Sequence, residues 1–370
     1  MQRIGQGKYA RQEIIEQLHF KHGTNLVRFR YDLLSRDEKK IGTLDTVRNG
    51  TVSMAALAQI KRTARFALQD TGDIDWLNDR IQPFCMLRMP DGGWVEWSLG
   101  IFLLSTPKRR EENRQVYRDV EAYDGLQVLV DDKFEARYTV PAGTNYATAI
   151  TTIIHDAGVA KINLQGTDKT LATAREFEPG TSKLEAINKL LTEINYTALW
   201  VDEWGHFTAS TYRSPQNREV EYTYRDDALS VITSRTEEEM DLFAIPNRWV
   251  AVVSNPEEEP LVASYTNDNP DSKTSTVSRG RVIVDYREME NVADQASLDA
   301  FVQRIAFEAS QVYTHITFMT AVMPFHSYSD VLQLEYGPLG ISGKYSETGW
   351  TMPLEAGAEM THQVRRAVNI

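Results

Sequence analysis

Alternating hydrophobic and polar residues, the pattern of half-buried β-strands, recur along most of the chain. The pattern covers Leu26–Leu33 and Arg62–Leu68 near the start and returns at Asn247–Ser254. Short segments rich in Gly, Asn, Asp, Pro and Ser, which favour turns, separate these runs. Further strands are predicted over residues 51–54, 86–89, 94–102, 116–123, 261–265, 281–286, 314–322, 330–335, 341–352 and 359–368. The chain is therefore predicted to be mostly β.

Three segments instead space their apolar residues at i, i+3 and i+4, which predicts amphipathic helices. The first follows Thr144, its expected cap, and ends at Gly158. The second begins at Ser182, whose spacing from Glu185 is that of a capping box. The third lies within Asp294–Val312 and is expected to cross one side of a rolled sheet. Their apolar positions are Ala147, Ile150, Ile153 and Ile154; Leu184, Ile187, Leu190, Leu191 and Ile194; and Leu298, Phe301, Val302, Ile305, Ala306 and Ala309.

Two distant segments, residues 86–123 and 331–368, contain the same order of elements. Each has a strand, a Gly-containing turn, a strand with a Gly-x-aromatic triplet, a polar hairpin tip and a closing strand. The triplets are Gly100–Phe102 and Gly343–Tyr345. Two unrelated β meanders would also look alike at this level, so that alternative stays open. A true repeat predicts the same supersecondary unit twice in one chain.

These patterns predict an α+β, β-dominated fold in which two tube-like small β-barrel domains flank an α+β insert. The predicted limits are an N-terminal arm at 1–23, a first barrel at 24–125, the insert at 126–215, a connecting segment at 216–246 and a second barrel at 247–370. The arm places Ile14, Ile15 and Leu18 on one face. It is too short to fold alone, so we expect it to pack on a neighbouring subunit or on its own barrel.

The composition is that of an ordinary globular protein, and the length of 370 residues suits two or three domains. No apolar run approaches the roughly 20 residues that cross a bilayer. The N-terminus lacks the apolar core of a secretory signal. Cys85 is the single cysteine, so an intrachain disulfide is excluded and synthesis in a reducing cytosol is expected.

The net charge of −12 is unevenly distributed. Residues 1–215 hold 28 basic and 28 acidic side chains, whereas residues 216–370 hold 12 and 24. This balance leaves no basic surface for gripping nucleic acid. The acidic clusters Glu237–Glu239 and Glu257–Glu259 are expected to be solvated loops. If acids of this half lined a channel, their repulsion would instead let a polyanion slide through without binding.

Motifs that carry chemistry are missing from the sequence. The seven histidines include no HExxH pair, and none has a cysteine partner for zinc. No Gly-rich phosphate loop or Gly-x-Ser-x-Gly elbow occurs. The neighbouring acids Asp131/Asp132 and Asp202/Glu203 are the candidates for a hydrolase, but adjacent acids on a turn usually diverge into solvent. We therefore expect no catalytic residue, no metal and no cofactor.

The layout of two similar barrels around an α+β insert resembles the hub proteins of bacteriophage tails. These are the baseplate hub of contractile tails and the N-terminal module of tail-associated lysins in long flexible tails. The resemblance covers nearly the whole chain beyond residue 24, with degenerate local patterns. Its carriers are Tyr138–Thr144 with the helix after it, Asn247–Ser254 followed by Pro260–Ala263, Ser278–Val282, the helix Ala296–Ser310, Ser329–Leu334 and Val364–Val368.

The resemblance implies a homotrimer whose two barrels per chain form a ring of six similar domains. Such a ring would join the six-fold tail tube to a three-fold tip. The implied partners are the tail tube protein ring, the distal tail protein, the tape measure C-terminus and tip or fibre proteins, with genomic DNA passing through the lumen. The implied location is the tail tip of a virion made in the host cytoplasm. Many relatives continue into a peptidase or lysozyme domain, which is not expected in a chain that stops at Ile370.

Aromatic and glycine positions of the two predicted barrels are candidates for structural or interface roles. They are Trp94, Gly100, Phe102, Trp249, Gly343, Tyr345 and Trp350. One alternative is a module that binds cell wall or saccharide, which exposed indoles on the Trp-rich strands would favour. A second alternative is a hydrolase that uses an unrecognised acid pair. A duplicated domain favours the hub, because it presents six near-equal faces from three chains.

Overall fold

The computed structural model describes residues 1–105, 108–233, 235–239, 243, 245–253, 260–289, 291–310 and 314–366. Four predicted features therefore lie wholly or partly outside the described residues. They are the end of the predicted strand at 254, the acidic cluster 257–259, the end of the third predicted helix at 311–312 and the end of the last strand at 367–368. The described strands form one 15-stranded sheet and three small ones.

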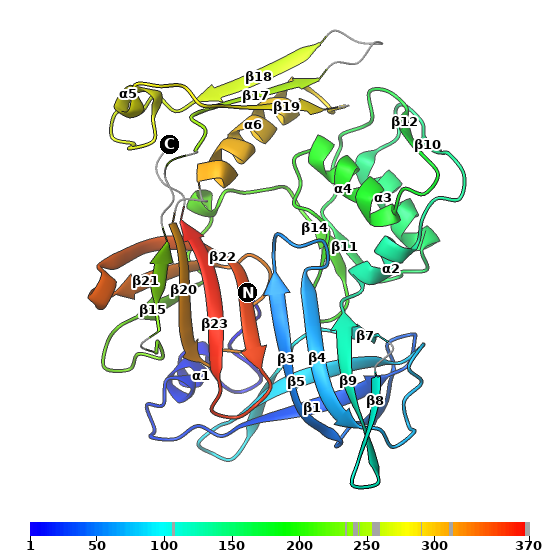
Figure 1. The fold of residues 1–370 in the computed structure, drawn as a ribbon, viewed down its shortest axis with the longest axis vertical. Helices are drawn as coiled ribbons and strands as arrows, with labels where there is room; N and C mark the ends of the chain where they lie inside the picture. Colours follow the sequence, from blue (N-terminus) through cyan, green and yellow to red (C-terminus); the bar gives the residue numbers. More distant parts are fainter. Residues whose placement is uncertain are drawn as a thin grey trace.

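The first repeat is a curled sheet built from nine strands near the N-terminus (Figure 1). Its pairing order is β3, β4, β9, a broken strand made of β6, β7 and β8, then β5, β1 and β2. The strands are β1 Val27–Leu34, β2 Lys40–Thr43, β3 Val47–Ala55, β4 Arg62–Gln69, β5 Arg80–Arg88, β6 Trp94–Ser98, β7 Phe102–Leu104, β8 Lys108–Glu112 and β9 Gln115–Tyr123.

The second repeat has the same pairing order. Its strands are β15 Tyr222–Arg225, β16 Glu237–Glu239, β20 Thr314–Ala321, β21 Val331–Tyr336, β22 Ile341–Pro353 and β23 Glu359–Arg366. The order β16, β20, β23, β22, β21, β15 corresponds to β3, β4, β9, β6–β8, β5, β1, and the equivalent strands also follow the same order along the chain. One difference is that β15 runs parallel to β21, whereas β1 runs antiparallel to β5. The repeat that the sequence indicates is thus present as strand pairing.

The two repeats are joined into one sheet by antiparallel pairing of β22 with β3. Figure 1 shows β20, β23, β22, β3, β4 and β9 side by side. They also share one core, which contains Phe66 of the first repeat together with Phe318 and Trp350 of the second. Neither repeat closes into a ring of hydrogen-bonded strands within the described residues, so each is an open curled sheet.

The insert is a separate α+β unit with its own core. It comprises α2 Leu126–Asp131, β10 Tyr138–Val140, α3 Tyr146–Asp156, β11 Ile162–Leu164, β12 Arg175–Phe177, α4 Lys183–Glu193, β13 Trp200–Val201 and β14 Phe207–Ala209. Ser182 caps α4 by accepting a hydrogen bond from the backbone N–H of Glu185, as predicted. The cap of α3 is Asn145 rather than the predicted Thr144, because the Asn145 side chain accepts from the backbone N–H of Thr148. A 3-10 turn, η1 Pro215–Asn217, leads out of the insert.

A third unit lies between β16 and β20 in sequence. Its strands β17 Arg248–Val253, β18 Leu261–Thr266 and β19 Val284–Met289 form their own sheet, with the short helix α5 Thr276–Arg279 before β19. The helix α6 Gln295–Ser310 covers one face of this sheet, the face turned toward the rest of the molecule (Figure 1). The interpretation that these strands open the second barrel is therefore wrong. Their hydrophobic residues pack against α6, and the supposed connecting segment supplies β15 and β16 instead.

The N-terminal arm forms the helix α1 Arg11–Leu18 and contacts both repeats, because Lys8 pairs with Asp91 of the first and Arg11 donates to the Glu221 carbonyl of the second. Ile14 and Leu18 are fully buried in the shared core, and Ile15 packs against its edge. The arm thus packs within its own chain, but it bridges both repeats instead of resting on the first alone. The β-dominated α+β class is confirmed.

Candidate channel surface

The joined sheet has one hydrophobic face and one polar face. Strand alternation sends Val52 and Phe66 into the core, while the intervening residues of β3 and β4 point the other way. One row on the polar face runs through Thr361, Thr351, Ser53 and Thr63, each directly opposite the next. The hydroxyl groups of Ser53 and Thr351 lie 3.0 Å apart across the seam between the repeats. The polar face is thus continuous from one repeat to the other.

Charges on this face are mixed and mostly in the first repeat. Arg65 of β4 pairs with Glu121 of β9 at 3.1 Å, and both side chains are more than half exposed. An open hollow of 830 Å³ lies here, lined by residues of β3, β4, β8, β9 and β22. Along β20, β22 and β23 the polar face carries one acid, Glu359, in the described part of the chain. The acidic excess of the second half therefore does not cover the central strands of this face.

The acidic cluster Glu237–Glu239 forms the strand β16 at the edge of the sheet, rather than a solvated loop. All three side chains are exposed, as expected for charged residues. The strand pairs antiparallel with β20, and the backbone of β16 is held there although its side chains contribute no burial.

The first three interface candidates contribute mainly to the interior of the first repeat. Phe102 is fully buried, and its ring meets Phe66 edge-to-face at 6.1 Å. Gly100 is also buried and has a φ of +127°. Trp94 is half-buried, and the Arg28 guanidinium lies 5.3 Å from the centre of its ring.

The other four candidates belong to two different units. Trp249 is fully buried in the β17–α6 unit. Tyr345 and Trp350 of β22 are buried in the shared core, where the Trp350 indole N–H donates to the Ser327 carbonyl at 3.0 Å. Gly343 is half-buried on β22, opposite Leu334. The structure thus places five of the seven candidates in the interior of a single chain, while their role in assembly stays a prediction.

We expect the substitution Gly100→Ala to lower the free energy of unfolding by about 1–3 kcal/mol, because φ values in this region are strained for any other residue. The added methyl would also lie 2.8 Å from Cδ of Arg62 and 3.0 Å from the Phe102 ring. Urea unfolding measures the effect. Gly166→Ala is the control, since nothing lies within 4 Å of its added methyl, and it should change stability by no more than about 0.5 kcal/mol. Equal effects of the two substitutions would contradict the prediction.

A buried polar cluster joins the two repeats and the insert. The Arg62 guanidinium of β4 donates to Glu203 of the insert at 2.8 Å and to the Leu99 carbonyl at 3.0 Å. The Ser327 hydroxyl, from the second repeat, donates to the same Glu203 carboxylate. Both ionic side chains are almost fully buried, at 1% and 8% exposure. The two repeats and the insert therefore each supply one member of a single charge-assisted contact.

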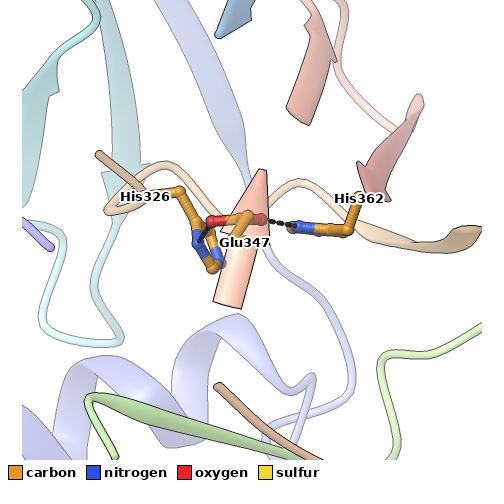
Figure 2. A group of neighbouring side chains, drawn as sticks. All are labelled: His326, Glu347 and His362. Carbon is orange, nitrogen blue, oxygen red and sulfur yellow. Dashed lines mark hydrogen bonds and ion pairs between the residues drawn. The ribbon is translucent and has the colours of Figure 1, made fainter. Parts of the chain in front are cut away.

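A second buried cluster lies inside the second repeat and contains His326, Glu347 and His362 (Figure 2). The Glu347 carboxylate accepts from Nδ1 of each histidine at 2.7 Å, one oxygen per ring. The remaining ring nitrogens contact the Tyr224 hydroxyl at 2.6 Å and the Thr320 hydroxyl at 2.9 Å. Each potential ligand atom thus already has a hydrogen-bond partner, which is the arrangement of a satisfied structural network rather than of an open metal site.

The charges of this cluster are balanced by burial and pairing. Burial alone would lower the pKa of His326, but the attraction of Glu347 and hydrogen bonds to Asp330 and Glu347 outweigh it and raise the pKa to about 9. Burial dominates at His362, whose pKa is lowered. The Met1 ammonium lies 2.6 Å from Asp330 and, together with His326, outweighs burial and lowers the pKa of that carboxyl. A protonated His326 therefore offsets Glu347, and His362 is neutral.

The paired acids of the sequence do not converge on a substrate site. Asp202 accepts hydrogen bonds from the backbone N–H groups of Trp204 and His206, which shape the turn between β13 and β14. Glu203 points into the interior toward Arg62, and Asp132 pairs with Lys183 at 2.6 Å. These carboxylates have structural partners. The two buried clusters escape sequence reasoning because their members are distant along the chain and follow no motif.

None of the described helices is long and apolar enough to cross a membrane. The sequence matches no protein-family model and no curated protein. Solved structures do match. A tail protein from Neisseria meningitidis has a TM-score of 0.65 at 11% identity, covering 92% of this chain and 97% of that one.

Two prophage proteins agree nearly as well. The 43 kDa tail protein of prophage MuSo2 from Shewanella oneidensis has a TM-score of 0.61 at 10% identity, covering 91% of this chain and 98% of that one. A prophage tail protein from Listeria monocytogenes has a TM-score of 0.56 at 11% identity, covering 90% and 94%. Such low identities establish the fold and not the activity. Over nearly its whole length, this chain has the fold of bacteriophage tail proteins.

Proposed function

We propose that this protein is a structural hub of a phage or phage-like tail tip. Three copies form a ring that joins a hexameric tail tube to a three-fold tip and surrounds the DNA channel. Its partners are then the tube ring above and the distal, tape measure and tip proteins around it. The similarity to phage tail proteins supports the setting, and the fold of the chain supports the role.

The observation that carries this proposal is the duplicated strand order. Six strand positions pair in the same order in both repeats, counting β6–β8 as one broken strand, and β22 and β3 join the repeats through regular antiparallel pairing. A protein that must match six-fold symmetry with three copies needs two equivalent surfaces per chain. A monomeric enzyme or saccharide receptor has no such need, so the duplication favours the ring.

The polar face of the joined sheet is the surface that we assign to the channel. It presents hydroxyl groups along the seam and mixed charges beside it, where the basic Arg65 and Lys108 lie opposite the acidic Glu121 and Asp119. A surface of this kind lets DNA pass without specific binding. The lumen therefore relies on small polar side chains more than on the acidic wall considered from the sequence.

The saccharide-binding alternative receives little support from the tryptophans. Trp97, Trp249 and Trp350 are buried, and Trp200 stacks on Tyr328 at 4.9 Å. Trp204 is the one indole among the strongly exposed large hydrophobic side chains of the described residues, at 51% exposure. A single exposed ring is a weak basis for sugar recognition, which uses aromatic surfaces together with convergent polar groups.

We expect the purified chain to form a trimer with a mass of about three times its 42.1 kDa. Native mass spectrometry measures this, and averaged electron micrographs of the same sample should show a ring with six similar lobes. The physical reason is that two equivalent repeats per chain close a six-membered ring with three copies. A monomer that persists at high protein concentration, or a ring of another stoichiometry, would contradict the proposal.

A further inference from the structure

We propose that neighbouring copies in the ring join by antiparallel pairing of β8 of one copy with β16 of the next. In this contact Lys108, Arg109 and Arg110 lie opposite Glu239, Glu238 and Glu237. The inference rests on the proposed trimeric ring and names the contact that closes it.

The seam inside each chain is the template for this contact. There β22 of the second repeat pairs with β3 of the first, with Thr351 opposite Ser53 and Pro353 opposite Thr51. In a ring of six similar repeats, every second junction lies between copies. At such a junction, the strand of the first repeat that is equivalent to β22 would pair with the strand that is equivalent to β3 in the second repeat of the next copy.

Those equivalents are β8 and β16. Phe66 and Phe318 are buried at matching places in β4 and β20, and they align the two repeats. Phe66 lies opposite Val120 of β9, and Phe318 lies opposite His362 of β23. From these positions, the pairing of β9 with β8 and of β23 with β22 makes Lys108–Arg110 of β8 equivalent to residues 351–353 of β22. In the same way Glu237–Glu239 of β16 match residues 51–53 of β3.

Both strands have a free edge in the described part of the chain. β8 pairs with β9 alone, and β16 pairs with β20 alone. Every residue of both strands is exposed. An unpaired edge presents a row of backbone donors and acceptors that accepts another strand. The two edges lie at opposite ends of the run of strands from β16 to β8, as a head-to-tail ring requires.

The register taken from the internal seam makes the charges complementary. Each base of Lys108–Arg110 faces one acid of Glu237–Glu239, and Glu112 faces the exposed Arg235. Opposite charges that are directly across an antiparallel pair stabilise it, and like charges destabilise it. The seam and the charge pattern are independent observations, and they select the same alignment.

Shifted alignments lose this match. Moving the strands by two residues in one direction places Glu111 and Glu112 opposite Glu238 and Glu237. Moving them by two in the other direction places Arg110 opposite Arg235. Pairing of β16 with a second β16 puts acids against acids. Pairing of β8 with a second β8 matches charges but forms a two-fold dimer, which cannot continue into a ring.

Charge reversal tests the contact. Arg109→Glu and Glu238→Arg should each weaken trimer formation at least about tenfold, and the double variant should restore it. Arg36→Glu, an equal charge change in the turn after β1, is the control and should leave the trimer unchanged. Analytical ultracentrifugation measures association, and circular dichroism shows that each variant is folded. Single reversals without effect on the trimer would overturn the contact.

Cysteine cross-linking tests the register. The variant Arg109→Cys/Glu238→Cys should form covalent dimers and trimers on oxidation, because directly opposed Cβ atoms fit a disulfide. The buried native Cys85 does not interfere. The single variant Arg109→Cys should give no disulfide-linked trimer on oxidation, because it lacks the second cysteine. If the wild type is a trimer but neither cross-linking nor reversal has an effect, this contact is wrong and the hub remains. A wild-type protein that is a monomer would overturn both the β8–β16 contact and the proposed hub. A wild-type dimer that Glu238→Arg does not weaken would indicate pairing of β8 with a second β8, and would overturn the β8–β16 contact.

Discussion

Replacing Arg62 by alanine is expected to lower the free energy of unfolding by about 3–5 kcal/mol. The guanidinium is 1% exposed and is the cationic partner of Glu203 at 2.8 Å. Without it, the Glu203 carboxylate stays buried, and the Ser327 hydroxyl is its remaining side-chain donor among the described residues. An uncompensated buried charge is far more costly than the loss of a surface pair. Chemical unfolding followed by tryptophan fluorescence measures the change.

The matched control is Arg65→Ala, three residues along the same strand on the opposite face. Arg65 is 76% exposed and pairs with the exposed Glu121, so its removal should cost at most about 1 kcal/mol. The double variant Arg62→Met/Glu203→Met removes both charges and should be more stable than Arg62→Ala alone. If Arg62→Ala and Arg65→Ala cost the same, the buried cluster does not hold the two repeats and the insert together.

Local patterns of the sequence predict most of the strands and helices, because alternation and capping act over a few residues. The helix α4 shows this, since Ser182 and the apolar face from Leu184 to Leu191 lie within three turns. The repeat is detectable for the same reason: its strands, turns and tips follow each other closely in both copies.

Long-range pairing is what the local patterns do not encode. The strands β17–β19 alternate like those of the large sheet, and it is their pairing with each other and the burial of Trp249 and Ala251 in the α6 core that assign them to a separate unit. In the same way, the charged segment Glu237–Glu239 has no hydrophobic signal, yet it pairs with β20 as an edge strand. Backbone hydrogen bonds place it there, and they leave no trace in side-chain type.

The candidate residues illustrate a related limit. A tryptophan or glycine beside a turn can serve an interface or a core, and the sequence does not separate the two. Phe102 and Trp350 are buried in their own chain, whereas the residues that we propose for the interface are charged and sit on β8 and β16. The charges on the edge strands β8 and β16 are seen to be complementary only when the register of the β22–β3 seam is applied to them.

Raising the pH from 6.5 to 10 is expected to remove about 3 kcal/mol of stability that depends on His326. Its pKa in the folded protein is about 9, against an ordinary value of 6.5, because Glu347 and Asp330 outweigh the effect of burial. A raised pKa means that the folded state binds the proton more tightly than the unfolded state. The stabilisation is therefore complete below pH 6.5 and is lost as the pH rises through about 9.

The measurement compares wild type with His326→Gln by urea unfolding across that range. The stability gap between them should be largest near pH 6.5 and should shrink by about 3 kcal/mol by pH 10, because wild type loses its proton while glutamine has none to lose. The lowered pKa of His362 acts in acid, since that residue costs stability as the pH falls below 6.5, so it does not disturb this window. The exposed His22→Gln is the control for the loss of a histidine outside this cluster. A gap between wild type and His326→Gln that does not change with pH would mean that Glu347 is balanced by another group, because a buried carboxylate between two neutral imidazoles lacks a counter-charge.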